Sequence, residues 1–390
     1  MKILNQQIFE NREAAALPGL MESGGLPALV SGLSGIHRVN LAAALYERLE
    51  LPLLIVCPDD SSAESFSRDL EAMTGEKVNT LYSRDFTFYS SLAASREAEQ
   101  KRLYVLNALR CGESPLTVAT VSALMQRTIP PQTLIKAAFT VKDGEPCPPE
   151  ELERALVRCG YTRCEQVEGA GQFSRRGGIV DFFSPSYPEP VRIEFWGDDI
   201  DSMGFFDVKT QRRTESVEAC RILPAAESLA TLATGGTEAL TEALTAAADK
   251  CSRHKSSQQL RELEQTLRTD IERLRQSVKL EYADRYMPFL YDKASGADYI
   301  PEEAVVFIDQ PPRCADRARG FVKQLGEDVG ELVKRGILAT DAPSFRISWE
   351  ELTSVLSGHA VYMADAFTVG RYPVEPKTLV SIPAKQLPSY

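Results

Sequence analysis

Over the first 120 residues, short apolar runs alternate with stretches in which apolar residues recur at helical spacing. The runs have the length and β-branched content of strands, and they cover residues 28–30, 53–57, 78–81 and 116–121. The run Leu53–Cys57 is apolar at every position, which is typical of a strand covered on both faces. After it, Ser61 and Glu64 have the spacing of a helix capping box. This rhythm predicts parallel βαβ units and the first half, residues 1–121, of an α/β domain.

From residue 122 the pattern changes to short strands and turns with a single helix over 149–158. Residues 179–183 and 191–196 are the clearest strands. From Val191 to Phe195 apolar and charged side chains alternate, which is the period of a half-buried antiparallel strand. The pattern predicts an inserted α+β domain over 122–224.

The α/β pattern returns after a helical region. An apolar stripe from Leu260 to Val278, in steps of three and four, predicts a long helix docked on a core. Residues 304–309 then predict a buried parallel strand, followed by a helix and a last strand near Val361. Residues 225–367 are therefore expected to form the second half of the α/β domain. The proline-rich stretch 368–390 has the composition of a linker toward a further C-terminal region.

Composition narrows the function classes. Apolar residues make up 43% and charged residues 25% of the chain, an ordinary globular balance. The net charge of −11 disfavours a sequence-blind grip on DNA phosphates by the chain as a whole. The longest apolar run has about seven residues, too few to span a bilayer, and the N-terminus has no signal-peptide core. We expect a cytoplasmic protein without a membrane partner.

The cysteines and histidines offer no catalytic or metal site. The eight Cys include no C-x-x-C pair, and the three His lie far apart in the sequence. Zinc-ligand spacing is therefore absent, and so is a nucleophile elbow. We expect no metal and no catalytic residues.

A turn between a predicted strand and a predicted helix stands where a phosphate-binding loop would lie. Such a loop needs G-x-x-x-x-G-K-[ST], in which glycines admit backbone N–H groups to the phosphates, Lys holds them and the hydroxyl binds Mg²⁺. Gly32 fits the first position, and Gly35 lies within the turn. His37, Arg38 and Val39 replace the second glycine, the lysine and the hydroxyl residue. The turn therefore predicts a degenerate loop.

The strand that ends at Asp309 shows a second defect. In a motor ATPase such a strand ends in Asp-Glu, where the Asp fixes Mg²⁺ through water and the Glu orients the attacking water. Asp309 is in place, but Gln310 holds the position of the base, and an amide cannot accept a proton as a carboxylate does. The two defects predict that this segment is not an enzyme and binds no ATP productively. By themselves, the residues also fit two ordinary strand ends without nucleotide ancestry.

The insert carries a family resemblance in the stretches Gly160–Arg163, Gly171–Phe183 and Arg192–Ser202. With the interrupted α/β domain and its degenerate loop, they closely resemble the N-terminal UvrB-homology module (domains 1a, 2 and 1b) of bacterial transcription-repair coupling factors, the Mfd family. The resemblance covers nearly the whole chain and implies a RecA-like, UvrB-like parallel-sheet domain without a functional nucleotide site. UvrB itself keeps intact nucleotide motifs and has an aromatic β-hairpin, for which the stretch 85–96 is too short.

The resemblance implies a role in nucleotide excision repair. In this family domain 2 binds UvrA by imitating UvrB, and so brings repair to lesions where RNA polymerase has stalled. The full-length protein is an ATP-dependent DNA translocase whose C-terminal regions engage RNA polymerase and double-stranded DNA.

The resemblance also assigns residues of the UvrA site. Arg163 and Arg176 match two UvrB arginines by position, and Phe182 or Phe183 lies at an aromatic contact position. UvrB has a further arginine where this chain has Ser174, and Arg175 beside it is included in the site. Independently of the family, arginines at a glycine-flanked turn can project their planar forks toward carboxylates on an acidic partner.

Two other hypotheses stay open on the sequence. The chain could be an ATP-binding, DNA-remodelling fragment related to UvrB that uses an atypical pocket. Alternatively, its UvrA surface could be covered by a C-terminal region of the full-length protein, as the family implies.

Overall fold

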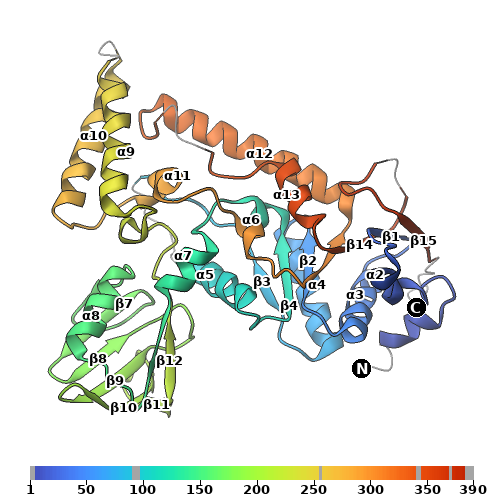
Figure 1. Cartoon of the computed structure of the whole chain (residues 1–390), viewed down its shortest axis with the longest axis horizontal. Coiled ribbons are helices and arrows are strands. Elements are labelled where there is room, and N and C mark those ends of the chain that lie inside the picture. Colours follow the sequence, from blue (N-terminus) through green and yellow to red (C-terminus); the bar gives the residue numbers. More distant parts are fainter. Residues whose placement is uncertain (1–4, 90–96, 254–256, 340–343, 369–370, 383–390) are drawn as a thin grey trace.

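A seven-stranded parallel sheet lies at the centre of the molecule (Figure 1). The computed structural model describes residues 5–89, 97–253, 257–339, 344–368 and 371–382. The strand order is β15-β1-β14-β13-β2-β4-β3, and every neighbouring pair is parallel. The strands are β1 (Ala28–Ser31), β2 (Leu53–Cys57), β3 (Asn79–Leu81), β4 (Leu116–Thr120), β13 (Val305–Asp309), β14 (Ala360–Asp365) and β15 (Thr378–Ser381). The predicted α/β class is confirmed.

Helices cover both faces of this sheet because its strands are apolar on both sides. Along β2, Leu53 and Ile55 belong to one core, while Leu54 and Val56 belong to the other. Helices α3 and α4 pack on the first face and α5, α6, α12 and α13 on the second. The helices are α2 (Leu20–Ser23), α3 (Ile36–Leu49), α4 (Asp60–Thr74), α5 (Glu97–Arg110), α6 (Val121–Met125), α7 (Pro131–Ala137), α12 (Pro311–Lys334) and α13 (Trp349–Leu356).

The N-cap of helix α4 is Asp59, two residues before the predicted cap Ser61. The carboxylate of Asp59 accepts a hydrogen bond from the backbone N–H of Ser62 at 3.0 Å and caps the helix. The predicted capping box between Ser61 and Glu64 is therefore wrong, because both residues lie inside the helix.

The insert is a layered unit with its own core. Its six-stranded sheet has the order β11-β10-β9-β8-β7-β6 and is antiparallel except for the β6–β7 pair. Helix α8 (Pro149–Arg158) packs on one face of it through Leu152 and Leu156. Strands β5 and β12 pair where the chain enters and leaves the unit. The strands are β5 (Phe139–Lys142), β6 (Thr162–Arg163), β7 (Gln172–Arg176), β8 (Ile179–Phe182), β9 (Val191–Trp196), β10 (Asp199–Phe206), β11 (Arg213–Ser216) and β12 (Ala219–Ile222).

Two segments differ from the predicted domain boundaries. Helices α6 and α7 pack into the α/β core through Leu124 and Leu134, so the inserted unit begins at β5 rather than at residue 122. Strand β15 lies inside the predicted linker and pairs with β1, which buries Val380. Residues 369–370 and 383–390 of that linker, and residues 90–96 of the stretch compared with the UvrB hairpin, lie outside the described residues.

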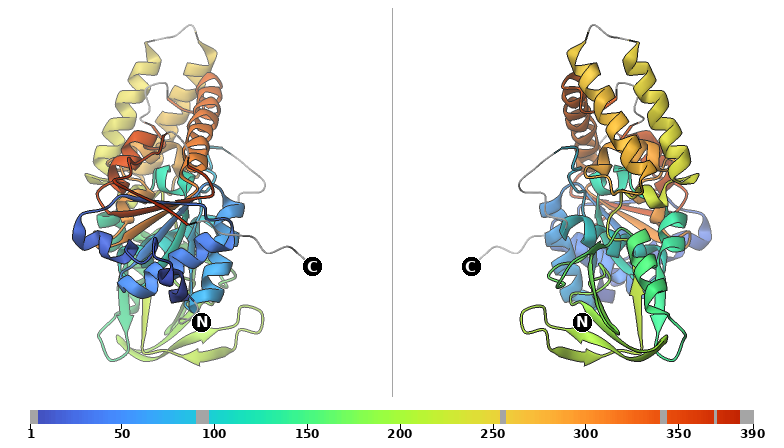
Figure 2. Two further views of the ribbon diagram at one scale, coloured as in Figure 1. Left: turned by 90° about the vertical axis from the view of Figure 1, so that its right-hand side faces the viewer. Right: turned by 90° about the vertical axis from the view of Figure 1, so that its left-hand side faces the viewer.

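A helical hairpin and the insert lie at opposite ends of the α/β domain (Figure 2). The hairpin consists of α9 (Gly236–Ser252) and α10 (Gln258–Arg275), and α11 (Met287–Leu290) follows it. The predicted stripe is buried from Leu263 to Leu274, whereas Val278 lies beyond the helix and is half exposed. Short 3-10 turns cover residues 7–10, 17–19, 230–232, 283–286 and 296–299.

A buried ionic cluster joins the insert to the rest of the chain. The guanidinium of Arg84 forms two 2.8 Å hydrogen bonds to Asp284 and a 2.9 Å bond to Glu227, which follows the last strand of the insert. Glu99 lies 3.4 Å from Arg84, and Arg102 lies 3.3 Å from Glu227. The cluster therefore ties four separate segments of the sequence together.

Candidate functional site

The turn that the sequence predicts to be a degenerate phosphate loop connects β1 to α3. Gly32 and Gly35 both have positive φ, +89° and +40°, so the turn uses the backbone freedom of glycine at these two positions. The His37 ring lies 3.2 Å from the carbonyl oxygen of Ser34. Val39 is 3% exposed and packs in the α/β core, where its side chain supports the helix rather than a ligand.

Arg38 and Asp309 form an ion pair that links the two predicted defects. The Nε of Arg38 donates to the Oδ1 of Asp309 at 2.5 Å, and its Nη1 donates to the carbonyl of Leu33 at 3.2 Å. The side-chain amide of Gln310 donates to the Oδ2 of Asp309 at 3.1 Å. Asp309 is 2% exposed, so both of its carboxylate oxygens are engaged inside the protein.

These residues do not fit magnesium-bound ATP. A metal bridge needs a carboxylate free to hold water, and Asp309 has protein partners on both oxygens. The oxygen of the Gln310 amide accepts a 2.9 Å hydrogen bond from Arg313, so the amide is held between Arg313 and Asp309. We therefore assign no step of ATP chemistry to this site.

The arginines assigned to the partner site lie on two faces of the insert's sheet. Arg175 and Arg176 are neighbours on β7, and successive side chains of a strand point to opposite faces. Arg175 contacts α8, while Arg176 contacts Asp181 on the face away from that helix. Arg163, on the edge strand β6, shares a carboxylate of α8 with Arg175 and so lies on the α8 side.

The first group, which we call the α8-side triad, consists of Arg163, Glu153 and Arg175. Glu153 lies 2.8 Å from Arg163 Nη1 and 3.3 Å from Arg175 Nη1. Arg175 also bonds to Glu150, which raises the pKa of Arg175 and lowers the pKa of Glu150. The side chain of Arg163 is 61% exposed and that of Arg175 only 22%. Only Arg163 thus offers most of its surface to a partner.

The second group, the outer triad, consists of Arg176, Asp181 and Arg192. Arg192 binds Asp181 through Nε at 2.7 Å and Nη2 at 2.9 Å, and this hydrogen bonding raises the pKa of Arg192. Its guanidinium also lies 4.6 Å from the centre of the Phe206 ring. Arg176 reaches Asp181 at 3.4 Å and keeps 57% of its side chain exposed, whereas Asp181 is almost fully buried. Arg192 and Asp181 lie in stretches that carry the family resemblance, but the sequence assigned neither a role in the site. The alternation of β9 places Arg192 on this face.

The two phenylalanines differ in exposure. Phe182 is fully buried in the core of the insert, so its assignment as an aromatic contact is not compatible with this structure. Phe183 is partly exposed. An aromatic residue that sequence reasoning passed over, Trp196, is 82% exposed at the end of β9. Its signal was present, because the alternation from Val191 to Phe195 places Trp196 on the charged face.

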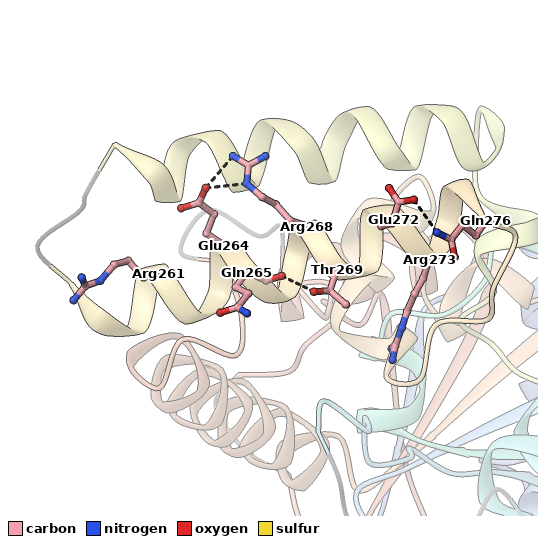
Figure 3. A pocket seen from close by; sticks show the side chains of 8 residues that line it. All are labelled: Arg261, Glu264, Gln265, Arg268, Thr269, Glu272, Arg273 and Gln276. Atoms are coloured by element: carbon pink, nitrogen blue, oxygen red, sulfur yellow. Dashed lines mark hydrogen bonds and ion pairs between the residues drawn. The ribbon is translucent and has the colours of Figure 1, made fainter.

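A shallow hollow lies along the polar face of α10 (Figure 3). Its side chains bond to one another along the helix: Arg268 to Glu264 at 2.9 Å, and Gln276 to Glu272 at 2.8 Å. The hollow is the solvated side of the predicted amphipathic helix and carries no ligand-binding constellation. It is lined by Arg261, Glu264, Gln265, Arg268, Thr269, Glu272, Arg273 and Gln276.

The described residues contain neither a cluster of metal ligands nor a membrane-spanning helix. No group of three or more His, Cys, Asp or Glu side chains within the described ranges could hold a metal ion. In the same part of the chain, no helix combines the length and apolar character needed to cross a bilayer.

Comparison with known families places a match on the insert. Residues 139–227 match the UvrB interaction domain. The match begins at the first residue of β5 and ends at Glu227 of the ionic cluster, so it coincides with the unit that carries both triads.

Known proteins are similar to most of the chain. A transcription-repair-coupling factor of Bacillus subtilis is 27% identical over 98% of this chain and 32% of its own length. The factors of Myxococcus xanthus and Escherichia coli are 34% and 30% identical over 51% and 52% of this chain. The chain thus spans about a third of the Bacillus subtilis relative. These matches support the assignment of the chain as an N-terminal UvrB-homology module of this family.

Proposed function

We propose that this chain is the UvrA-recruiting module of a transcription-repair-coupling factor and that it performs no chemistry itself. The observation that carries the proposal is the match of residues 139–227 to the UvrB interaction domain, on the unit that exposes Arg163 and Arg176. By presenting a UvrB-like surface, the module brings excision repair to stalled RNA polymerase. Contacts with polymerase and duplex DNA belong to the remainder of the longer protein.

The chemistry of the exposed arginines suits an acidic partner surface. A guanidinium presents its donors in a planar fork that matches a carboxylate, and it loses less hydration on burial than an ammonium does. Arginine is also among the residues that dominate the binding energy of protein interfaces. UvrA carboxylates that reach Arg163 and Arg176 would therefore supply the main anchors.

The test is the affinity of UvrA for the purified chain and for Arg163→Ala, Arg176→Ala and the double variant. Loss of a desolvated arginine anchor costs about 2 kcal/mol, so each single change should weaken binding about 30-fold. Arg212→Ala is the matched control, because Arg212 is exposed and precedes β11 at the opposite edge of the same sheet. Unchanged affinity in the double variant would remove the assigned site, and no binding of the wild-type chain would remove the function.

We also propose that the segment does not turn over ATP. Asp309 is neutralised by Arg38, and the residue that follows it is an amide. The alternative of an ATP-driven remodelling fragment has no support in this geometry.

A further inference from the structure

Both exposed arginines of the insert are held in the same way. In each triad one carboxylate lies between an exposed arginine and a second arginine that is largely covered. Glu153 and Asp181 are the carboxylates, with side chains 20% and 1% exposed. The same arrangement of one carboxylate between two arginines occurs on both faces of β7, which suggests that the two carboxylates have a common role.

We propose that Glu153 and Asp181 are positioning residues that aim Arg163 and Arg176 at the partner, and that the covered arginines act through them. This inference rests on the proposed function, and it describes how the residues of the proposed UvrA site are held in place. It also changes the role of Arg175, which becomes an internal support instead of a partner contact.

The contacts of Arg163 leave its fork available. A guanidinium has five N–H donors, and within the described residues Arg163 engages Nη1 toward Glu153. The Arg163 side chain is 61% exposed, so a partner carboxylate can bind it without displacing Glu153. Arg175 differs, since Nη1 and Nη2 are both bonded to α8 and little of its side chain is exposed.

Glu153 is itself fixed from two sides. Its helix is docked on the sheet by Leu152 and Leu156, which are 2% and 0% exposed. Arg175 holds the second carboxylate oxygen, so Glu153 cannot rotate away without losing that contact. A long arginine side chain that is already ordered loses less conformational entropy when the partner binds.

The outer triad repeats this plan more tightly. Asp181 accepts two bonds from Arg192 and lies opposite Ser174 in the β7–β8 pair. Its remaining contact, at 3.4 Å, holds Arg176 at the glycine turn that follows β7. Asp181 is thus a buried carboxylate held by Arg192, and it supports Arg176, whose side chain is 57% exposed.

The placement of the triads defines the docking geometry. Arg163 and Arg176 lie on opposite faces of the sheet, at its β6–β7 edge. A flat partner surface laid on one face meets only one of them. The partner surface of UvrA must therefore straddle this edge and present a carboxylate on each side.

The experiment is a double-mutant cycle on UvrA binding with the full chain. Glu153→Gln keeps the size of the side chain and removes the charge that holds Arg163. We expect a loss of affinity of about fivefold, the cost of ordering one long side chain. The control is Glu151→Gln, an exposed glutamate on the same helix for which no side-chain bond to arginine exists among the described residues. Thermal unfolding of each variant is measured alongside.

A positioning role predicts a specific coupling. In an Arg163→Ala background, Glu153→Gln should cause no further loss, and Arg175→Ala should lose its effect once Glu153 is changed. Equal losses in both backgrounds, or no loss from Glu153→Gln while Arg163→Ala weakens binding, would overturn the inference and leave the proposed function standing. If neither arginine variant weakens binding, the proposed site fails and the inference fails with it.

Discussion

The ion pair between Arg38 and Asp309 joins the start of α3 to the end of β13. In a nucleotide-binding domain these two ends hold phosphate and magnesium. Here the acidic side chain is 2% exposed and has a cation of the same chain as its partner. This pair of side chains thus bridges the start of α3 and the end of β13.

Removal of Arg38 should therefore destabilise the fold. Arg38→Ala leaves the buried carboxylate of Asp309 without its cation, and breaking a buried pair in this way costs about 3–5 kcal/mol. Chemical denaturation measures the loss, and Arg12→Ala, at an exposed position, should change the free energy of unfolding by less than about 0.5 kcal/mol. An unchanged free energy of unfolding in Arg38→Ala would show that the ion pair does not stabilise the fold.

Titration calorimetry with magnesium and ATP tests the nucleotide prediction on the wild-type chain. We expect no saturable heat at micromolar to millimolar ATP, because both carboxylate oxygens of Asp309 have protein partners and position 39 is a valine instead of a hydroxyl residue. Micromolar binding that is lost in Asp309→Asn would show instead that the site still accepts nucleotide.

At this scale the sequence identifies residues but not their partners. The identities at Arg38, Val39 and Gln310 predict a degenerate site because function there depends on residue type, and the loss of nucleotide binding stays a prediction. That Arg175 and Arg176 lie on opposite faces of the sheet and differ in exposure could be predicted from the sequence only in part. Strand alternation separates their faces, but the carboxylates that cover Arg175 come from a helix whose packing the sequence does not specify.

Helix α8 shows how an element positions a site. Its leucines at 152 and 156 face the sheet, and its acidic first turn then lies beside the arginines. The apolar spacing decides which face docks, and the docked face decides where Glu150 and Glu153 point.

Leu156→Ala should test this docking. Leu156 is fully buried, and truncation of such a leucine costs about 2–5 kcal/mol. Val157→Ala is the adjacent control, since Val157 is 54% exposed and its loss should cost less than about 0.5 kcal/mol. Unfolding midpoints in urea measure both, and equal midpoints would contradict the packing of α8.

Elements with strong periodicity were predictable and short ones were not. Helix α8 and strand β9 have the predicted bounds, because a full stripe or a clean alternation marks them. Strand β15 has four residues, with Leu379 exposed and Val380 buried. The neighbouring prolines led to the prediction of a linker instead of a strand. Its place beside β1 depends on pairing across almost the whole chain, which no local pattern encodes.

The ionic cluster around Arg84 connects parts of the molecule that are distant in sequence. It contains the cations Arg84 and Arg102 and the carboxylates Glu99, Glu227 and Asp284. Burial raises the pKa of Glu99 to about 7, although Arg84 opposes this effect. The excess of one carboxylate explains why one member of the cluster is protonated most easily.

The stability of the molecule should then fall as pH rises from about 5 to 7. The folded state keeps a proton on Glu99 that the unfolded state has released, so unfolding is favoured as that proton is lost. We expect on the order of 2 kcal/mol, because the side chain is 14% exposed and solvent screens part of the effect. Glu99→Gln should abolish this slope, whereas Glu113→Gln, at an exposed position, should retain it. Parallel slopes in all three proteins would refute the assignment.

Strand β6 has only two residues, both exposed, at the border of the insert's sheet. Unprotected borders of this kind invite pairing between molecules, and short charged strands discourage it. Arg163 therefore has a second effect besides its proposed role in recruitment. Identical copies of the chain bring the same positive charge to this border, which disfavours their pairing and favours a surface of opposite sign. Replacing Arg163 with an apolar residue would remove that protection and favour self-association at high concentration.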